Sequence, residues 1–158
     1  MAPARQIQNL SCDESFRSAA GKIIWTRFDE MMSFKAAAQL RKSSAGVHDM
    51  RVGSRRLRAA LEAFQSAFPT KGLKPLLREI KALARVLGMV RDLDVMLQQL
   101  QKDVDSGTED ERVALRELIT DLQSGRQAAR TRLDVRLKHL DDIDFERRFL
   151  SFVARETM

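Results

Sequence analysis

A short segment of the chain places one histidine and four arginines on a single helical face. At about 100° per residue, Arg51, Arg55 and Arg58 fall within about 80° of His48, and Arg56 falls at the edge of the same face. Large apolar residues lie on the opposite side: Met50, Leu57, Leu61, Phe64 and Phe68. Like charges three and four residues apart repel each other, and acids at these spacings are too few to neutralise the arginines. This pattern favours a face that binds a polyanion over an ordinary solvated face, which mixes both signs of charge.

A second row of cations follows about twenty residues later. Lys71, Lys74, Arg78, Lys81 and Arg85 step by three and four residues, which again places them on one helical face. Two consecutive antiparallel helices could line a groove with these two faces. Repeated phosphates bind evenly spaced cations with release of counterions, and arginine adds bidentate hydrogen bonds. The predicted anion-binding residues are His48, Arg51, Arg55, Arg56, Arg58, Lys74, Arg78, Lys81, Arg85 and Arg91.

The composition locates the positive charge in one region and narrows the class of protein. The chain has 158 residues and a net charge of +6, and residues 35–91 carry thirteen Lys or Arg against three acids. One cysteine, Cys12, excludes an internal disulfide, and no Cys/His cluster offers a zinc site. We expect no metal and no cofactor. No apolar run is long enough to span a membrane, and no signal peptide is evident, so we expect a cytoplasmic protein.

The hydrophobic pattern predicts helices throughout, joined by short polar links. We expect an all-α fold: an up-and-down antiparallel bundle of about four long helices with a short C-terminal helix. Residues 1–12 are predicted to be a flexible N-terminal arm, and residues 13–158 a single helical domain. The first predicted helix covers residues 13–42, and the second follows the link at 43–46 and ends at about residue 68. The other three cover residues 74–103, 110–140 and 145–155.

No catalytic set accompanies the basic rows. The sequence lacks a Ser/His/Asp arrangement, a Gly-rich phosphate loop and a carboxylate cluster for magnesium, so we expect no enzymatic activity and no catalytic residue. Arg91, Asp92 and Asp94 could suggest a metal site, but carboxylates two residues apart on a helix point in different directions. Internal salt bridges that orient the arginines are the favoured interpretation, with Asp92 near the basic row.

Two other functions fit parts of the pattern. Basic helices bind nucleic-acid backbones whatever the bases, although the chain has no tyrosine and few aromatic residues for stacking. A histidine phosphotransfer protein is also a four-helix bundle with an exposed histidine, and His48 with Arg51 and Gly53 loosely resembles its motif. A second basic helix is not needed for phosphotransfer, so polyanion binding remains the leading hypothesis.

The segment VHDMRVGSRRLRAALEAF, followed by KALARVLGMVRDLDV, resembles the signature of the CHAD family, the conserved-histidine α-helical domain. The first motif runs from His48 to Arg58, and the second from Leu87 to Asp94. The resemblance implies a helical bundle that binds inorganic polyphosphate, often beside triphosphate tunnel enzymes, and an association with polyphosphate granules. It assigns the anion-binding role to His48, Arg51, Arg55, Arg56, Arg58, Lys81 and Arg85.

The resemblance also implies a second helical half with its own histidine-arginine helix. Nothing after Asp110 repeats that motif, because His139 is followed by Leu-Asp-Asp. The chain therefore resembles the first half of a two-bundle CHAD architecture. It is either truncated or completed by a second copy in a homodimer. We expect the apolar side of the C-terminal segment to be part of the dimer surface: Phe145, Phe149, Phe152 and Val153.

Overall fold

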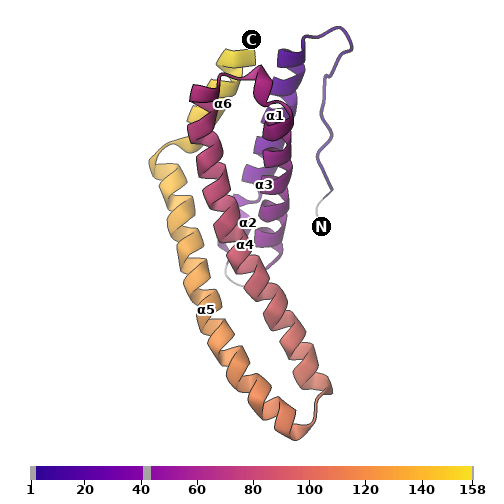
Figure 1. Ribbon diagram of the computed structural model, residues 1–158, viewed down its shortest axis with the longest axis vertical. Coiled ribbons are helices and arrows are strands. Elements are labelled where there is room, and N and C mark those ends of the chain that lie inside the picture. The colour runs from indigo at the N-terminus through magenta and orange to yellow at the C-terminus, as the bar shows by residue number, and fades with distance from the viewer. Residues whose placement is uncertain (1–2, 41–43, 158) are drawn as a thin grey trace.

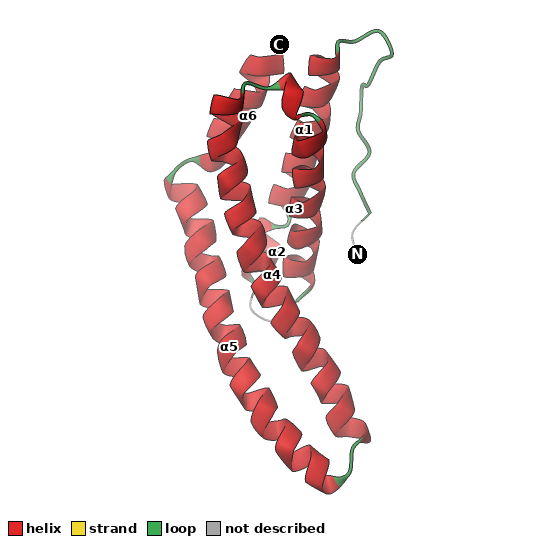
Figure 2. Ribbon diagram, viewed as in Figure 1, coloured by secondary structure: helices red, strands yellow, loops and turns green. Residues whose placement is uncertain are grey.

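The structure is a computed structural model that describes residues 3–40 and 44–157. Within these ranges the ordered elements are helices, and no strand occurs (Figure 2). The prediction of an all-α fold is therefore confirmed. The α-helices are α1 (Phe16–Ser33), α2 (Lys35–Gln39), α3 (Ala45–Ala63), α4 (Thr70–Ser106), α5 (Glu109–Asp142) and α6 (Phe145–Thr157), with a 3-10 helix η1 (Gln65–Ala67) before α4.

Several predicted boundaries differ from the structure. α1 begins at Phe16 rather than at residue 13, and α3 ends at Ala63 rather than near residue 68. The helix expected over 13–42 is divided at Phe34, whose N–H bonds back to Met31 O and closes α1 with a tighter turn. The helix expected from residue 74 begins at Thr70, directly after Pro69, so Pro75 lies inside α4. The break expected at 105–110 is only Gly107 and Thr108. Residues 41–43, which include the predicted helix end and the start of the link, lie outside the described residues.

Two long helices, α4 and α5, form an antiparallel hairpin that extends well beyond the other helices (Figure 1). The tight turn is stabilised by a capping box in which the Glu111 carboxylate accepts from the Thr108 backbone N–H at 2.8 Å. α3 packs beside the first part of α4, α1 and α2 pack against α3, and α6 returns to cover α1. None of the described helices is long and apolar enough to cross a membrane.

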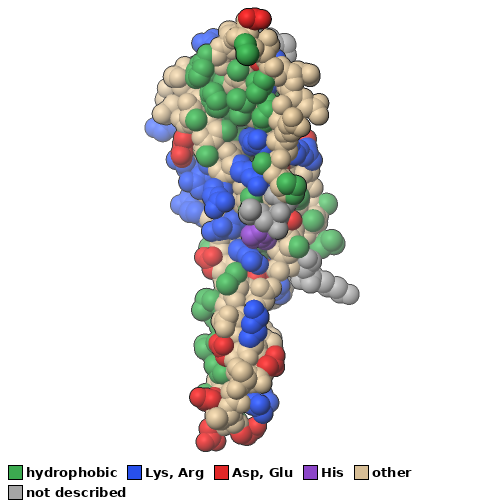
Figure 3. Space-filling model, turned by 90° about the vertical axis from the view of Figure 1, so that its right-hand side faces the viewer, with side chains coloured by type: hydrophobic (Ala, Val, Ile, Leu, Met, Phe, Trp, Pro, Cys, Tyr) green, Lys and Arg blue, Asp and Glu red, His purple; other side chains and the backbone are tan. Residues whose placement is uncertain are grey.

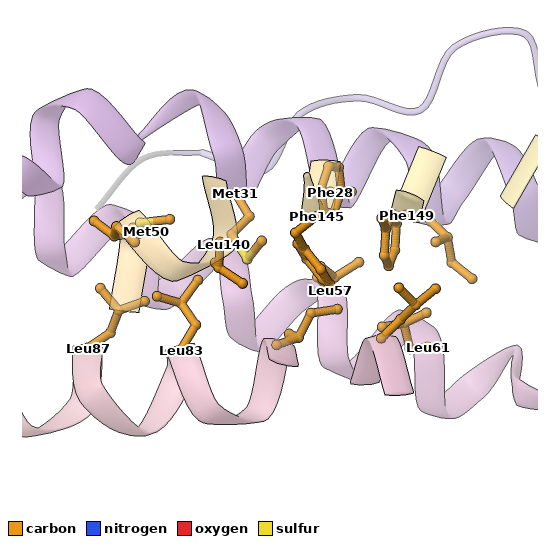
Figure 4. Packing of buried hydrophobic residues seen from close by; sticks show 14 of the residues in the cluster. Phe28, Met31, Met50, Leu57, Leu61, Leu83, Leu87, Leu140, Phe145 and Phe149 are labelled. Atoms are coloured by element: carbon orange, nitrogen blue, oxygen red, sulfur yellow. The ribbon is translucent and has the colours of Figure 1, made fainter. Parts of the chain in front are cut away.

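The core lies where α1, α3, α4, α5 and α6 meet (Figure 4). Phe28 of α1 stacks on Phe149 of α6 with ring centroids 4.1 Å apart, and Phe145 contacts both rings. Leu57 and Leu61 of α3 close the same layer and are buried. The expectation that α6 presents an exposed dimer surface is therefore wrong: Phe145, Phe149, Phe152 and Val153 are all buried within this chain.

The inner side of α3 can approach its neighbours closely because it carries glycine. A Cβ added at Gly46 would lie 2.2 Å from the backbone carbonyl carbon of Ala37 in α2. A Cβ added at Gly53 would lie 2.9 Å from the Cα of Met31 in α1. These contacts hold the buried side of α3 against α1 and α2, which directs the opposite side outward.

The N-terminal residues from Pro3 to Ser15 contain no helix and run beside α1 (Figure 1). The Arg5 side chain pairs with Asp29, and the Arg5 carbonyl accepts from Arg27 Nη1 at 2.9 Å. α1 itself begins at Phe16, where Ser15 caps it by accepting from the Ser18 N–H at 3.1 Å. The arm therefore meets the α1 side of the bundle.

Candidate functional site

The outward side of α3 carries the predicted row of cations. Arg55 is exposed, and His48, Arg51 and Arg58 are half-buried. The opposite side of the helix supplies Val47, Met50, Leu57 and Leu61 to the core. The helical pattern thus predicted correctly which side of α3 is buried and which carries charge.

Arg56 does not join this row. Its guanidinium forms an ion pair with Glu30 of α1, whose carboxylate is 1% exposed and also accepts from Arg27 Nη1 at 2.6 Å. A buried carboxylate needs such partners because an isolated buried charge is strongly destabilising. The Glu30 carboxylate thus sets Arg56 apart from the other arginines of α3, and its role in anion binding stays a prediction.

The charged side of α3 lies beside α4. A methyl group added at Gly88 of α4 would lie 3.9 Å from Arg51 Nε. Because the two helices are antiparallel, one turn from this contact brings Arg55 level with Arg85, and a further turn brings Arg58 level with Lys81. In the other direction His48 comes level with Arg91, whose charge acts on the imidazole. The two basic rows predicted from the sequence are thus brought together.

A groove of about 500 Å³ follows the outer side of α4. It runs between long cationic side chains, and Pro75 and Leu77 form its apolar part. Figure 3 shows Lys and Arg side chains gathered over the middle of the molecule with a histidine among them. The cationic residues that line the groove are Lys71, Lys74, Arg78, Lys81 and Arg85.

The cations of the two rows form few ion pairs with the described carboxylates. Among the described residues, the only ion pair of the two rows is Arg78 Nε with Glu79 Oε1, at a loose 3.7 Å. Arg58 Nε is buried and lacks a hydrogen-bond partner in the same part of the chain. A buried donor without a partner is unfavourable. We use the name basic surface for His48, Arg51, Arg55, Arg58, Lys71, Lys74, Arg78, Lys81, Arg85 and Arg91.

The surroundings of His48 disfavour its protonated form. Partial burial lowers the pKa of the imidazole below its ordinary value, and the positive charges of Arg91 and Arg51 lower it further. Asp49 opposes this effect without reversing it. In the absence of a bound anion, His48 is therefore neutral at physiological pH, and a nearby negative charge would reverse this balance.

Asp94, rather than Asp92, makes the salt bridges that orient arginines. Its side chain is 2% exposed and contacts Arg126 and, at 3.7 Å, Arg130 Nη2, both on α5. Arg130 also donates to the Ala38 carbonyl at 3.2 Å and so joins α2 to the hairpin. Asp92 is exposed. Asp94, at the end of the second motif, thus joins α4 to α5 through these ion pairs.

Comparison with known families matches residues 22–157 to the CHAD domain. The chain belongs to the CHAD domain family. The matched range covers every helix from the second turn of α1 to the end of α6, and it contains the whole basic surface. The resemblance found in the two sequence motifs is therefore confirmed over most of the chain.

One solved relative is the crystal structure of the CHAD domain from the plant Ricinus communis. It superposes with a TM-score of 0.70 at 28% sequence identity, and the match covers 99% of this chain and 50% of the plant chain. Two uncharacterized proteins from different strains of Mycobacterium tuberculosis are each 37% identical over 60 residues. That match covers 38% of this CHAD domain and 12% of each mycobacterial protein. The chain thus spans half of the plant relative and a small part of the two bacterial ones.

Proposed function

We propose that this CHAD domain binds inorganic polyphosphate, or a similar linear polyanion, on the basic surface and performs no catalysis. The observation that carries the proposal is the meeting of two cationic rows along the α3–α4 seam, whose described residues form only one loose ion pair. A surface of this kind is unfavourable alone, because its charges repel one another. A polyanion would remove the repulsion.

The dimensions of the surface suit a linear ligand. From Lys74 to Arg91 the α4 row extends about 25 Å, at about 1.5 Å per residue. Cations occur at each turn from Lys74 to Arg85, Gly88 follows one turn later, and the arginines of α3 flank this row. An arginine can form two parallel hydrogen bonds with phosphate oxygens, whereas lysine acts as a point charge. A polymer with a phosphate at every repeat could therefore contact successive turns, while single phosphate ions would gain little.

A direct test compares long-chain polyphosphate, orthophosphate and double-stranded DNA at several salt concentrations. We expect polyphosphate to bind most tightly, with a strong decrease in affinity as salt rises. DNA binding as tight as polyphosphate binding at equal salt would instead support a general nucleic-acid backbone function. Lack of binding to either polymer would contradict the proposal.

The matched variants are two double substitutions that remove the same charge. Arg55→Ala with Arg58→Ala should weaken polyphosphate binding about tenfold or more, which corresponds to about 1.4 kcal/mol, and should reduce the salt dependence. Arg17→Ala with Arg132→Ala removes two exposed arginines outside the basic surface and should have little effect. Equal weakening by both pairs would show that only net charge matters and that the α3–α4 seam is not the site.

A further inference from the structure

A second pocket, of about 450 Å³, lies between the first part of α4 and the outer side of α6. The apolar side of α6 faces the core. Its other side presents Arg148, Ser151 and Arg155, which are three, four and seven residues apart and therefore share one helical face. From α4 the pocket is lined by Gly72, Pro75 and Leu76, and Arg147 and Phe152 complete it from α6.

The arginines of this pocket keep hydrogen-bond donors available. Arg148 is exposed and forms no ion pair with any described residue. Arg147 and Arg155 each use Nε for a neighbouring acid, Asp144 and Glu156 respectively. Their terminal amino groups remain free for a ligand, because a guanidinium carries five N–H donors. These side chains are well suited to a phosphate group.

The floor of the pocket is rigid and apolar. Gly72 lets the Phe152 ring lie against α4, since a Cβ at this position would be 2.4 Å from Phe152 Cε2. The Arg155 guanidinium lies 5.8 Å from the centroid of the same ring, a cation–π distance. Phe152 itself is 6% exposed and packs beside Phe68. The Phe152 ring therefore helps to hold Arg155 at the pocket.

The pocket adjoins the basic surface. Pro75 lines both this pocket and the groove that contains Lys71, Lys74 and Arg78. We infer that the α4–α6 pocket is a second phosphate-binding subsite, which receives the next phosphates of a polyanion that has followed the α4 row to the start of the helix. This inference rests on the proposed function, because it assigns the continuation of the same ligand. It predicts that long chains contact α6 as well as α3 and α4.

The test uses the full chain with Arg148→Gln and Arg155→Gln together. We expect the affinity for long-chain polyphosphate to decrease about fivefold, as two exposed ion pairs would allow. Arg17→Gln with Arg132→Gln is the matched control for charge and should bind as the unsubstituted protein does. If the unsubstituted protein and the control bind but the α6 variant binds equally well, the subsite is overturned while the proposed function stands.

A second measurement reports contact directly. Phenylglyoxal modifies accessible arginines, and mass spectrometry locates the modified positions. Long-chain polyphosphate should slow modification of Arg148 and Arg155 severalfold and leave Arg132 unaffected. Protection of Arg55 and Arg85 without protection of Arg148 would overturn the subsite. Absence of protection at Arg55, Arg85, Arg148 and Arg155 alike would instead count against the proposed function itself.

Discussion

Protonation of His48 should strengthen polyphosphate binding as the pH falls from 8 to 5. In the free protein, burial and the charges of Arg91 and Arg51 hold the pKa of His48 below its ordinary value of 6.5. A phosphate beside the imidazolium would raise the pKa in the complex. Because the bound pKa is then higher than the free pKa, binding takes up protons. The added affinity is complete below the free pKa and is lost as the pH rises through the bound pKa.

The magnitude follows from the exposure of the side chain. His48 is half-buried on the outer side of α3, and even in a water-like dielectric, which gives the smallest effect, one phosphate charge at about 4 Å contributes about 1 kcal/mol. At about 1.36 kcal/mol per pKa unit, this raises the pKa by about 0.7. The affinity should therefore be about fivefold higher at pH 5 than at pH 8.

The assay is a series of calorimetric titrations at fixed ionic strength between pH 5 and pH 8. Titration in two buffers with different ionisation enthalpies also counts the protons taken up. His48→Gln should lose the proton uptake and keep most of the affinity at pH 8, and it controls for the titration of polyphosphate itself. Arg91→Gln should raise the pKa of His48 in the free protein, as an NMR titration of the imidazole would show. The same pH dependence in the His48→Gln variant and the unsubstituted protein would refute the reasoning.

Other predictions concern stability and assembly. Gly46→Ala places a Cβ against the Ala37 backbone and should destabilise by about 3 kcal/mol. In contrast, Gly125→Ala meets nothing within 4 Å on exposed α5 and should stabilise by about 0.5–1 kcal/mol; urea unfolding of both variants checks the pair, and equal effects would contradict it. Asp94→Ala removes the buried carboxylate that pairs with Arg126 and Arg130 and should cost about 3–5 kcal/mol in the same assay, so a loss below about 1 kcal/mol would argue against an important ion pair. The homodimer stays a prediction: light scattering should give about twice the 18.0 kDa chain mass, and a monodisperse monomer would contradict it. Because Phe149 is buried, Phe149→Asp should unfold the chain rather than release folded monomers, which a loss of the helical circular dichroism signal would show.

Local periodicity was sufficient for much of the site. The side chains of a helix repeat at about 100° per residue, so the positions of Arg51, Arg55 and Arg58 relative to Leu57 already indicated a charged side and a buried side. The same rule identified the α4 row, and short links indicated that the two helices run antiparallel. The family resemblance could also be recognised from the sequence, because it depends on two motifs within the chain rather than on contacts between distant segments.

Contacts between distant segments decided the rest. Arg56 has the same residue type and nearly the same spacing as its neighbours, but a buried carboxylate 26 residues earlier sets it apart from them. The sequence pattern of α6 would also fit an apolar side that packs against a second copy of the chain. In the structure this side packs on Phe28, because α5 runs back along α4 and places α6 beside α1. The pocket beside Arg148 forms only where α6 crosses Gly72. The sequence by itself determined which residues share a side of each helix, since that depends on backbone geometry within a few residues. Only the tertiary structure decided which sides meet, because that depends on the packing and charge of residues far apart in the chain.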